Sequence, residues 1–217
     1  MNISVPTNKK ELMERASTLN GITTQQLANK LNKGIPNTLT HAKGWLGNLL
    51  EEYLGAEAAS AAKPDFIDLG IELKTLPLND KGKPKESTYV CVVQLEPSSL
   101  TSWKTSLVKH KLSEVLWIPY EAHKDIPISN RRIGTPFLWK PNQEQEKQLK
   151  QDWEEICDMI VLGELNNINS SMGNYLQIRP KAANAKSLTV NKNEFANKYT
   201  LPRGFYLRSS FTETIIP

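Results

Sequence analysis

The first third of the chain spaces its apolar residues three and four positions apart, as amphipathic helices do. This pattern predicts helices over residues 7–19, 25–32 and 42–54, the first capped by Thr7 and the last ended by a C-cap at Gly55. The third helix is expected to carry its large apolar residues on one face: Trp45, Leu49 and Tyr53.

From residue 65 the hydrophobic period shortens from about 3.6 residues to about 2, which is the period of a strand. Residues 66–76 alternate apolar and polar side chains, so a strand with two different faces is expected there. A turn signal at 79–82 and a β-branched segment at 87–95 follow. Together these segments predict a β-hairpin.

The rest of the chain adds one long helix and three short strands, expected at 144–165, 114–119, 175–178 and 204–207. This order of elements indicates an α/β protein with a mixed sheet flanked by helices. No linker rich in glycine, serine or proline divides the sequence. Residues 1–217 are therefore expected to form a single domain with two lobes and a hinge near 96–104.

The composition, 39% hydrophobic and 23% charged residues, provides enough apolar material for a core. No apolar run approaches the ~18–20 residues that span a bilayer, and no apolar segment follows a basic start. We therefore expect a soluble, cytoplasmic protein without a membrane partner. Cys91 and Cys157 lie far apart and outside any metal-binding spacing, so reduced, buried thiols are expected.

The charge balance is mildly basic, with 27 Lys and Arg against 23 Asp and Glu and a net charge of +4. Such a small excess does not by itself identify a nucleic-acid-binding protein. Six of the basic residues are arginines, which recognise phosphates and bases in a bidentate manner better than lysine does. An arginine in a loop is therefore a candidate for recognition.

The clearest candidate for chemistry is the group Asp65, Glu72 and Lys74. Glu72 and Lys74 are two positions apart on an expected strand, so their side chains leave the same face while Leu73 turns to the core. Asp65 precedes the strand, and two neighbouring carboxylates favour a hard divalent cation. Residue type and spacing alone leave an alternative open, because alternating Glu and Lys on a strand face is also typical of a solvated surface.

Longer sequence motifs favour the metal site over a solvated surface. The sequence closely resembles the MutH family of mismatch-repair endonucleases, in order and over nearly the whole chain. The matching segments are KGWLGNLLE (43–51), PDFIDLGIELKT (64–75), KHKLSEVLW (109–117), WEEICDMIVLG (153–163), IRPKAANAK (178–186) and LPRGFYL (201–207).

The resemblance implies a restriction-endonuclease-like fold with two lobes around a DNA-binding cleft. It implies Mg²⁺-dependent nicking of the unmethylated strand, 5′ to the G, at hemimethylated or unmethylated GATC sites in double-stranded DNA. It also implies activation by MutL. A monomer is expected, because a single active site meets a palindrome once and cuts one strand per event.

For the catalytic site, the resemblance implies that Asp65 and Glu72 ligate the metal, with the Leu73 carbonyl as a third ligand. Lys74 would position or activate the attacking water. Glu51 falls on an additional acidic position of the family and would complete a second metal site. Lys111 would support the reaction near the scissile phosphate. Taken alone, Glu51 also fits a surface carboxylate, and Lys111 fits a solvated basic helix.

For DNA binding, the resemblance implies a base-reading loop after the strand expected at 175–178, a phosphate or active-site-edge contact just before Gly44 and Trp45, and two aromatic contacts. By themselves these residues also fit an ordinary basic loop and packed aromatic side chains. Arg179 and Tyr206 would lie near the methylated adenine, and Tyr89 would stack or wedge against DNA. The full set is Lys43, Tyr89, Arg179, Pro180, Lys181, Ala182, Lys186 and Tyr206.

Two alternatives to a methyl-directed nickase remain open. One is a type II restriction endonuclease of the same superfamily, which cuts both strands. The other is a DNA-binding module that has lost catalysis, although every acidic and lysine position of the site is filled.

Overall fold

The computed structural model describes residues 3–36, 44–57, 62–181, 188–191, 193 and 199–217. The chain forms two compact units, each assembled from separate segments. The first unit comprises Met1–Lys85 and Ser113–Lys140, and the second comprises Glu86–Leu112 and Pro141–Pro217. Residues 96–104, where the sequence predicts a hinge, lie within the second unit.

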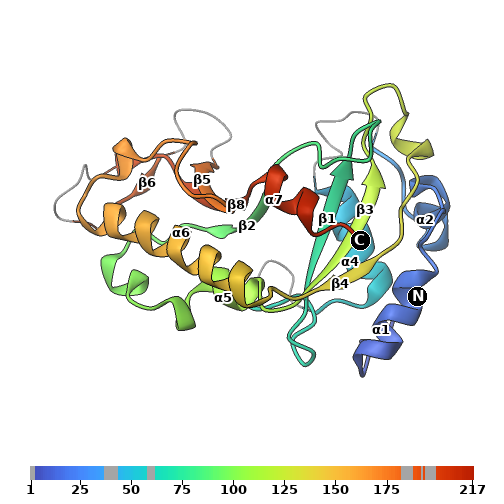
Figure 1. Cartoon of the computed structure of the whole chain (residues 1–217). Coiled ribbons are helices and arrows are strands. Elements are labelled where there is room, and N and C mark those ends of the chain that lie inside the picture. Colours follow the sequence, from blue (N-terminus) through green and yellow to red (C-terminus); the bar gives the residue numbers. More distant parts are fainter. Residues whose placement is uncertain (1–2, 37–43, 58–61, 182–187, 192, 194–198) are drawn as a thin grey trace. The chain divides into compact units, whose positions relative to one another are not determined.

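The sheet of the first unit has the strand order β1-β3-β4, formed by β1 (Glu72–Leu78), β3 (Val115–Glu121) and β4 (Phe137–Trp139). Strand β1 runs parallel to β3, and β4 is antiparallel to β3 (Figure 1). The central strand β3 is buried over its first five residues, as expected for a strand covered on both faces.

The expected hairpin between residues 66–76 and 87–95 is wrong. Strand β1 begins only at Glu72 and pairs with β3, whereas β2 (Thr88–Val92) belongs to the sheet of the second unit. The period of 2 located a strand in each segment, although β1 begins only at Glu72. It carries no information about which strands pair, and parallel partners require a long connection that local sequence does not reveal.

Three helices of the first unit were expected, and all three are present: α1 (Lys9–Ser17), α2 (Thr24–Lys30) and α4 (Trp45–Leu54). Thr23 caps α2 and forms a reciprocal capping box with Gln26. The expected cap of α1 is wrong by one residue, because Asn8 accepts the bond from the backbone of the first turn.

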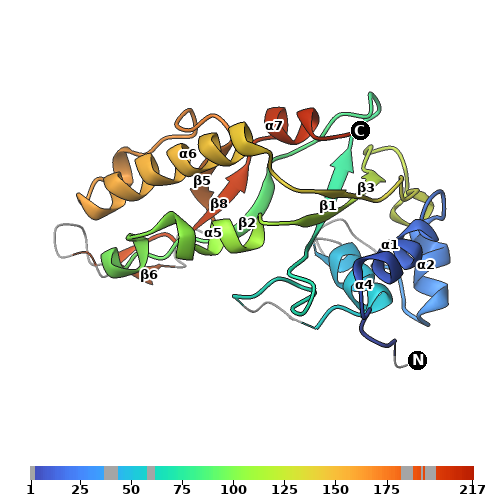
Figure 2. The same ribbon diagram turned by 60° about the horizontal axis from the view of Figure 1, so that its bottom comes forward.

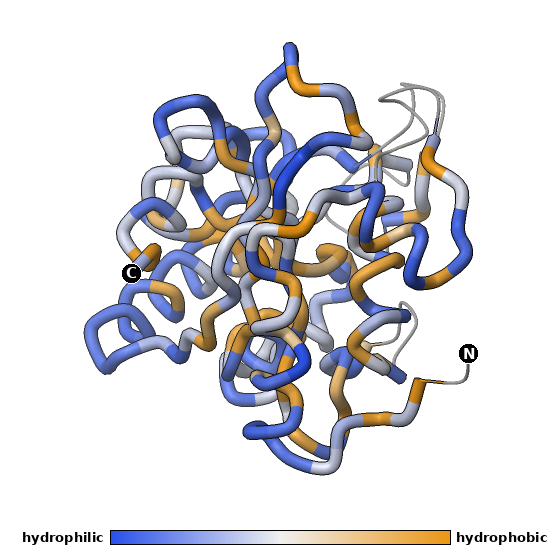
Figure 3. Tube along the Cα trace, turned by 90° about the vertical axis from the view of Figure 1, so that its right-hand side faces the viewer, coloured by the Kyte–Doolittle hydropathy of each residue, from blue (hydrophilic) through white to orange (hydrophobic). Residues whose placement is uncertain are grey.

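The buried face of α4 differs from the expected one. Leu46, Leu49, Leu50 and Leu54 are buried, whereas Trp45 and Tyr53 are half-buried. The buried side chains of α1, α2 and α4 form one core with Ile71, Leu73, Leu116 and Ile118 of the sheet region. Figure 3 shows hydrophobic and hydrophilic residues alternating along the helical turns, as amphipathic helices require.

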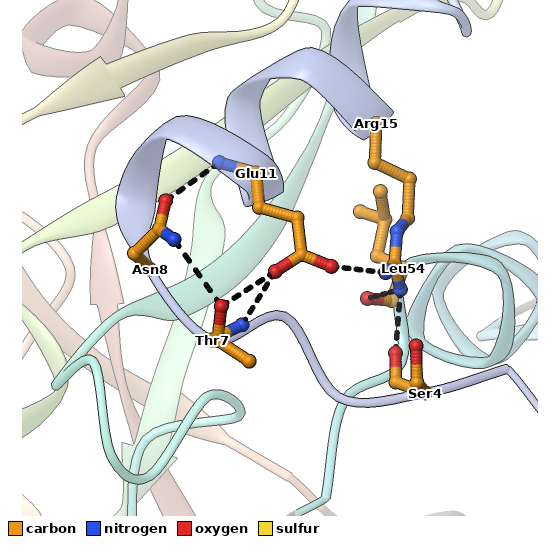
Figure 4. Close-up of polar contacts among 6 residues, drawn as sticks. All are labelled: Ser4, Thr7, Asn8, Glu11, Arg15 and Leu54. Atoms are coloured by element: carbon orange, nitrogen blue, oxygen red, sulfur yellow. Dashed lines mark hydrogen bonds and ion pairs between the residues drawn. The ribbon is translucent and has the colours of Figure 1, made fainter.

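The N-terminal segment is fastened to the end of α4 by Arg15 (Figure 4). Its Nη1 donates to the Ser4 carbonyl at 2.7 Å and to the Leu54 carbonyl at 3.0 Å, while Nη2 pairs with Glu11 at 3.0 Å. Gly55 ends α4 with φ +79°, and a Cβ there would lie 2.5 Å from the Ser4 carbonyl oxygen. Only glycine fits both the backbone and this close approach.

The sheet of the second unit is antiparallel, with the order β2-β8-β5, and contains β8 (Arg203–Leu207) and β5 (Leu176–Pro180) beside β2. The long helix α6 (Gln143–Val161) runs along this sheet in both ribbon views (Figures 1 and 2). Both expected strands and the long helix are thereby confirmed, although α6 ends before residue 165.

Shorter elements complete the described part of the chain. The first unit contains the 3₁₀ turn η3 (Ile128–Asn130), and all the others belong to the second unit. They are α5 (Leu107–Lys111), α7 (Ser209–Thr214), β6 (Thr189–Val190), β7 (Tyr199–Thr200), η1 (Pro97–Leu100), η2 (Trp103–Thr105) and η4 (Leu165–Asn167). Among the described residues, every helix is too short or too polar to cross a membrane.

Candidate active site

The predicted site residues are divided between the two units. Glu51, Asp65, Glu72, Leu73 and Lys74 lie in the first unit, and Tyr89, Lys111, Arg179, Pro180, Lys181 and Tyr206 lie in the second. Lys43, Ala182 and Lys186 fall outside the described residues.

A tight reversal of the chain brings Asp65 beside the start of β1. Phe66 and Ile71 exchange backbone hydrogen bonds, and Gly70 adopts φ +66° between them. This turn closes the eight-residue separation between Asp65 and Leu73, so that the Leu73 N–H donates to Asp65 Oδ2 at 2.8 Å. The expected continuous strand from residue 66 is therefore wrong: residues 66–71 turn, and the strand proper begins at Glu72.

Glu72 and Lys74 form an enclosed ion pair on one face of β1. Lys74 Nζ lies 2.6 Å from Glu72 Oε1, and the two side chains are 13% and 2% exposed. Leu73, between them, is buried in the core on the opposite face. The shared face confirms the strand prediction, and the burial excludes the alternative of a solvated Glu/Lys surface.

Glu51 lies in the last turn of α4 and is half-buried. Its carbonyl oxygen accepts hydrogen bonds from the backbone of Gly55 and of Ala56, so the helix end that carries it is well defined. Arg15 holds the same helix end through the Leu54 carbonyl. The position of Glu51 therefore depends on the anchoring of the N-terminal segment.

The donors around Glu72 suit a small, hard cation. Carboxylate and carbonyl oxygens are the protein ligands that Mg²⁺ prefers, and Mg²⁺ retains several waters, so two carboxylates and one carbonyl are a sufficient protein share. The Leu73 N–H donates to Asp65, Glu72 directly precedes Leu73, and both carboxylate residues are buried. Within the described ranges, no group of three or more His, Cys, Asp and Glu side chains is arranged to hold a metal ion, so Glu51 does not complete a three-carboxylate cluster.

In the second unit, two of the predicted DNA-binding tyrosines pack against each other. Tyr89 of β2 is opposite Tyr206 of β8, with ring centroids 5.3 Å apart at 65°. Lys181 Nζ lies 3.6 Å from the centroid of the Tyr89 ring, in cation–π geometry. Partial burial raises the pKa of the Tyr206 phenol, and the nearby Tyr89 adds to this, whereas Arg179 opposes it. Partial burial also lowers the pKa of the Lys181 ammonium.

The predicted base-reading segment leaves β5 at its exposed end. Arg179, Pro180 and Lys181 are all exposed, and the Lys181 N–H donates to the Pro202 carbonyl at 2.7 Å. Arg179 is opposite Gly204 on the neighbouring strand, which places it near Tyr206. An arginine, a lysine and two tyrosines thus gather along one region of the second unit's sheet.

Lys111 is the last residue of α5 and is half-buried. Ser106 caps this short helix, and Val108 within it is buried. Lys109 forms an ion pair with Glu146 of α6. The segment is therefore a packed turn of the second unit, and the alternative of a freely solvated basic helix does not describe it.

One buried polar residue was not identified as important from the sequence. Asp152 of α6 is 1% exposed and accepts backbone hydrogen bonds from Asn174, Tyr175 and Leu176 at 3.0, 2.6 and 2.8 Å. Gln148 donates a fourth, at 2.8 Å. Asp152 thereby fixes the start of β5, the strand that ends at the base-reading segment. Its signal was present, since it occupies an apolar position of the α6 helical period.

The fold and these residues define a class: a mixed α/β protein with a buried carboxylate–lysine site at the start of β1, an edge strand of its sheet, with residue types suited to hydrolysis. Residues 54–152 match the sequence model of a family described as "DNA mismatch repair enzyme MutH". This matched segment contains Asp65, Glu72, Leu73 and Lys74.

Relatives extend the match to nearly the full chain. The "DNA mismatch repair protein MutH" of Yersinia enterocolitica is 50% identical over 208 residues, 95% of this chain and 91% of the relative. The protein of the same name from Escherichia coli K12 is 48% identical over 215 residues, 99% of this chain and 94% of the relative. The one from Serratia proteamaculans is 50% identical over 212 residues, covering 97% and 93%. The chain belongs to the MutH family of DNA mismatch repair enzymes.

Proposed function

We propose that this protein is a Mg²⁺-dependent endonuclease that nicks the unmethylated strand, 5′ to the G, at hemimethylated or unmethylated GATC sites. The observation that carries the proposal is the enclosed Glu72–Lys74 pair beside the Asp65–Leu73 hydrogen bond, in a chain of the MutH family. A buried carboxylate pair next to an ammonium group is suited to metal-assisted phosphodiester hydrolysis.

The roles follow from the chemistry of each group. Asp65, Glu72 and the Leu73 carbonyl would hold Mg²⁺, which when bound supplies Lewis-acid activation of water and neutralises charge on the phosphate. Lys74, held within 2.6 Å of Glu72, orients the attacking water and stabilises the negative charge that develops in the transition state. Glu51 and Lys111 would assist, Glu51 as a further acidic group and Lys111 near the scissile phosphate.

DNA recognition is assigned to the second unit. Arg179 and Lys181 are exposed and suited to base edges or phosphates, and Pro180 shapes the segment between them. The Tyr89–Tyr206 pair provides aromatic surface, and we assign Tyr206 to the neighbourhood of the adenine methyl group. Lys43, Ala182 and Lys186 complete the proposed DNA-binding set. The proposal also includes a monomer as the active form and MutL as the activator.

A supercoiled plasmid with GATC sites, incubated with the protein and Mg²⁺, tests this proposal. Nicked circles that depend on Mg²⁺ and on GATC are the expected product, and fully methylated plasmid should resist. Linear product without a nicked intermediate would instead identify a restriction enzyme that cuts both strands. Intact plasmid at high protein concentration would identify a DNA-binding module without catalysis. The Lys74→Ala variant, purified in parallel, controls for contaminating nucleases.

A further inference from the structure

Gly204 interrupts the otherwise bulky strand β8, and its backbone gives no reason for a glycine. Its φ lies outside the left-handed region that favours glycine, and it pairs regularly with Arg179 of β5. Glycine within a strand weakens the strand, because it adds chain entropy to the unfolded state and packs no side chain. The glycine therefore needs an explanation in the surrounding space.

The surrounding space is filled by two aromatic rings. A Cβ on Gly204 would lie 2.8 Å from Cε2 and 3.2 Å from Cδ2 of Tyr89, and 3.0 Å from Cε2 of Tyr206. The 2.8 Å contact is shorter than real Cβ atoms show, and contacts of 3.0 and 3.2 Å are tighter than nearly all of those observed, so the rings would have to shift. Both rings therefore lie directly over the Gly204 Cα, and the missing side chain is what lets them do so.

The ring of Tyr89 is held from a second side. Lys181 Nζ stands 3.6 Å from its centroid, and the Lys181 backbone is tied to Pro202, two residues before Gly204. Tyr206 meets Tyr89 edge to face at 5.3 Å. Lys181, the Tyr89 ring and the Tyr206 ring thus pack one against the next, with both rings against the Gly204 backbone.

We propose that Gly204 is a positioning residue for specificity: it forms the seat that fixes the depth and tilt of the Tyr89 and Tyr206 rings before DNA binds. This inference rests on the proposed function, in which Tyr206 lies near the adenine methyl group. Preorganised rings lose little conformational entropy on binding, and they discriminate by shape only if their depth is fixed.

The ring position set by Gly204 affects discrimination between hemimethylated and fully methylated DNA. Other residues carry out the cleavage chemistry. Gly204 is buried and has no side chain, so it cannot itself contact the substrate. The atoms that a Cβ would displace are ring edges, which move by side-chain rotation while the strand pairing stays in place. The substitution Gly204→Ala should therefore tilt the two rings and leave the protein folded.

The test compares Gly204→Ala with wild type in the full-length protein. Nicking rates on hemimethylated and fully methylated GATC duplexes give a discrimination ratio, which should fall by about tenfold, the scale of sub-ångström misplacement of a recognition group. The rate on unmethylated duplex should change much less than the ratio. Gly34→Ala is the matched control, because a Cβ there meets nothing within 4 Å and its φ is also outside the left-handed region.

A second measurement needs no DNA. Absorbance titration of the tyrosines, with Tyr206→Phe to assign the signal, should show the raised pKa of Tyr206 returning toward its ordinary value in Gly204→Ala, because the displaced ring gains solvent. In a Tyr89→Leu background, which removes the shortest contact, Gly204→Ala should have a smaller effect on the titration than it has in wild type. The Tyr89→Leu background also gives the added methyl group more room. If Gly204→Ala alone misfolds, the double variant still tests the inference.

An unchanged Tyr206 titration and an unchanged discrimination ratio in folded Gly204→Ala would overturn the inference. The proposed function fails separately, if Tyr206→Ala, which removes the ring, and wild type discriminate equally while the titration of Gly204→Ala still shifts. A shifted titration together with a reduced ratio supports both.

Discussion

Lys74 Nζ and Glu72 Oε1 lie 2.6 Å apart in an almost fully enclosed pair. The pair gives the protein a charged group that is fixed in place without being exposed. Because an ammonium and a carboxylate in such surroundings each depend on the other, a change in either one should be felt in both stability and chemistry.

We expect Lys74→Ala and Glu72→Ala to lower the nicking rate by at least about 100-fold while DNA affinity stays nearly unchanged, since these groups serve the reacting phosphate and the metal. Measurement of single-turnover nicking and of DNA binding in the same buffer checks this. Full nicking activity in either variant would disprove the catalytic assignment.

The same Lys74→Ala variant should also unfold more readily, by about 1–3 kcal/mol in urea, because it leaves Glu72 buried without its partner. Lys33→Ala is the control: its pair with Glu52 spans 3.0 Å but both side chains are nearly half exposed, and such pairs contribute about 0–1 kcal/mol. Equal losses in the two variants would contradict the role of burial.

Asp152→Asn should destabilise the protein by about 2–4 kcal/mol, because a neutral amide replaces a buried carboxylate that accepts four hydrogen bonds. Asp158→Asn, on the exposed side of the same helix, should stay within about 0.5 kcal/mol of wild type. Urea unfolding of both variants measures the difference. A neutral outcome at Asp152 would mean that the start of β5 is held by other contacts.

The thiol of Cys157 should react very slowly with alkylating reagents in the folded protein. Burial raises its pKa from 9.0 to about 12, and the neighbouring Asp158 and Glu154 add to the shift, so little thiolate forms at pH 8. Since the folded pKa exceeds the unfolded one, the unfolded chain loses its proton first as the pH rises. The free energy of unfolding should therefore fall between about pH 9 and about 12, and Cys157→Ala should show a smaller fall.

DNA affinity should fall steeply as salt rises, because phosphate contacts release counterions. Lys181→Met should reduce the slope of log K against log salt by about 1. Lys150→Met is the control and should leave the slope unchanged, because Lys150 pairs with Glu154. Fluorescence anisotropy with a GATC duplex measures both slopes. Affinity that does not change between low and physiological salt would exclude the proposed basic contacts.

Sequence patterns predicted the strand that carries Glu72 and Lys74, the long helix α6 and the strands β5 and β8, because each depends on short-range periodicity. They did not predict that residues 66–71 turn back, which is the step that brings Asp65 to Leu73. Nor did they predict that β1 pairs with β3, since strand pairing depends on contacts over forty positions away in sequence.

The candidate site also contains residues that the sequence identified and residues that it did not. Residue type and family resemblance singled out Asp65, Glu72, Lys74, Tyr89 and Tyr206. The sequence did not single out Gly204 or Asp152. Gly204 matters because it has no side chain where two tyrosine rings pack, and Asp152 because it accepts hydrogen bonds from the backbone of a segment distant in sequence. Asp152 interrupts the apolar period of α6, but that interruption does not reveal which groups it binds, and Gly204 leaves no periodic signal at all.

The chain crosses between the two units three times, near residues 85, 112 and 140. Strand β3, the central strand of the first unit's sheet, is therefore made only after 27 residues of the second unit have been synthesised, from Glu86 to Leu112. During synthesis, β1 therefore has no strand to pair with until β3 leaves the ribosome, although the helices of the first unit have already been made. The first unit thus cannot complete its sheet until the segment up to Lys140 has been synthesised, and by then the Glu86–Leu112 segment of the second unit has already been made.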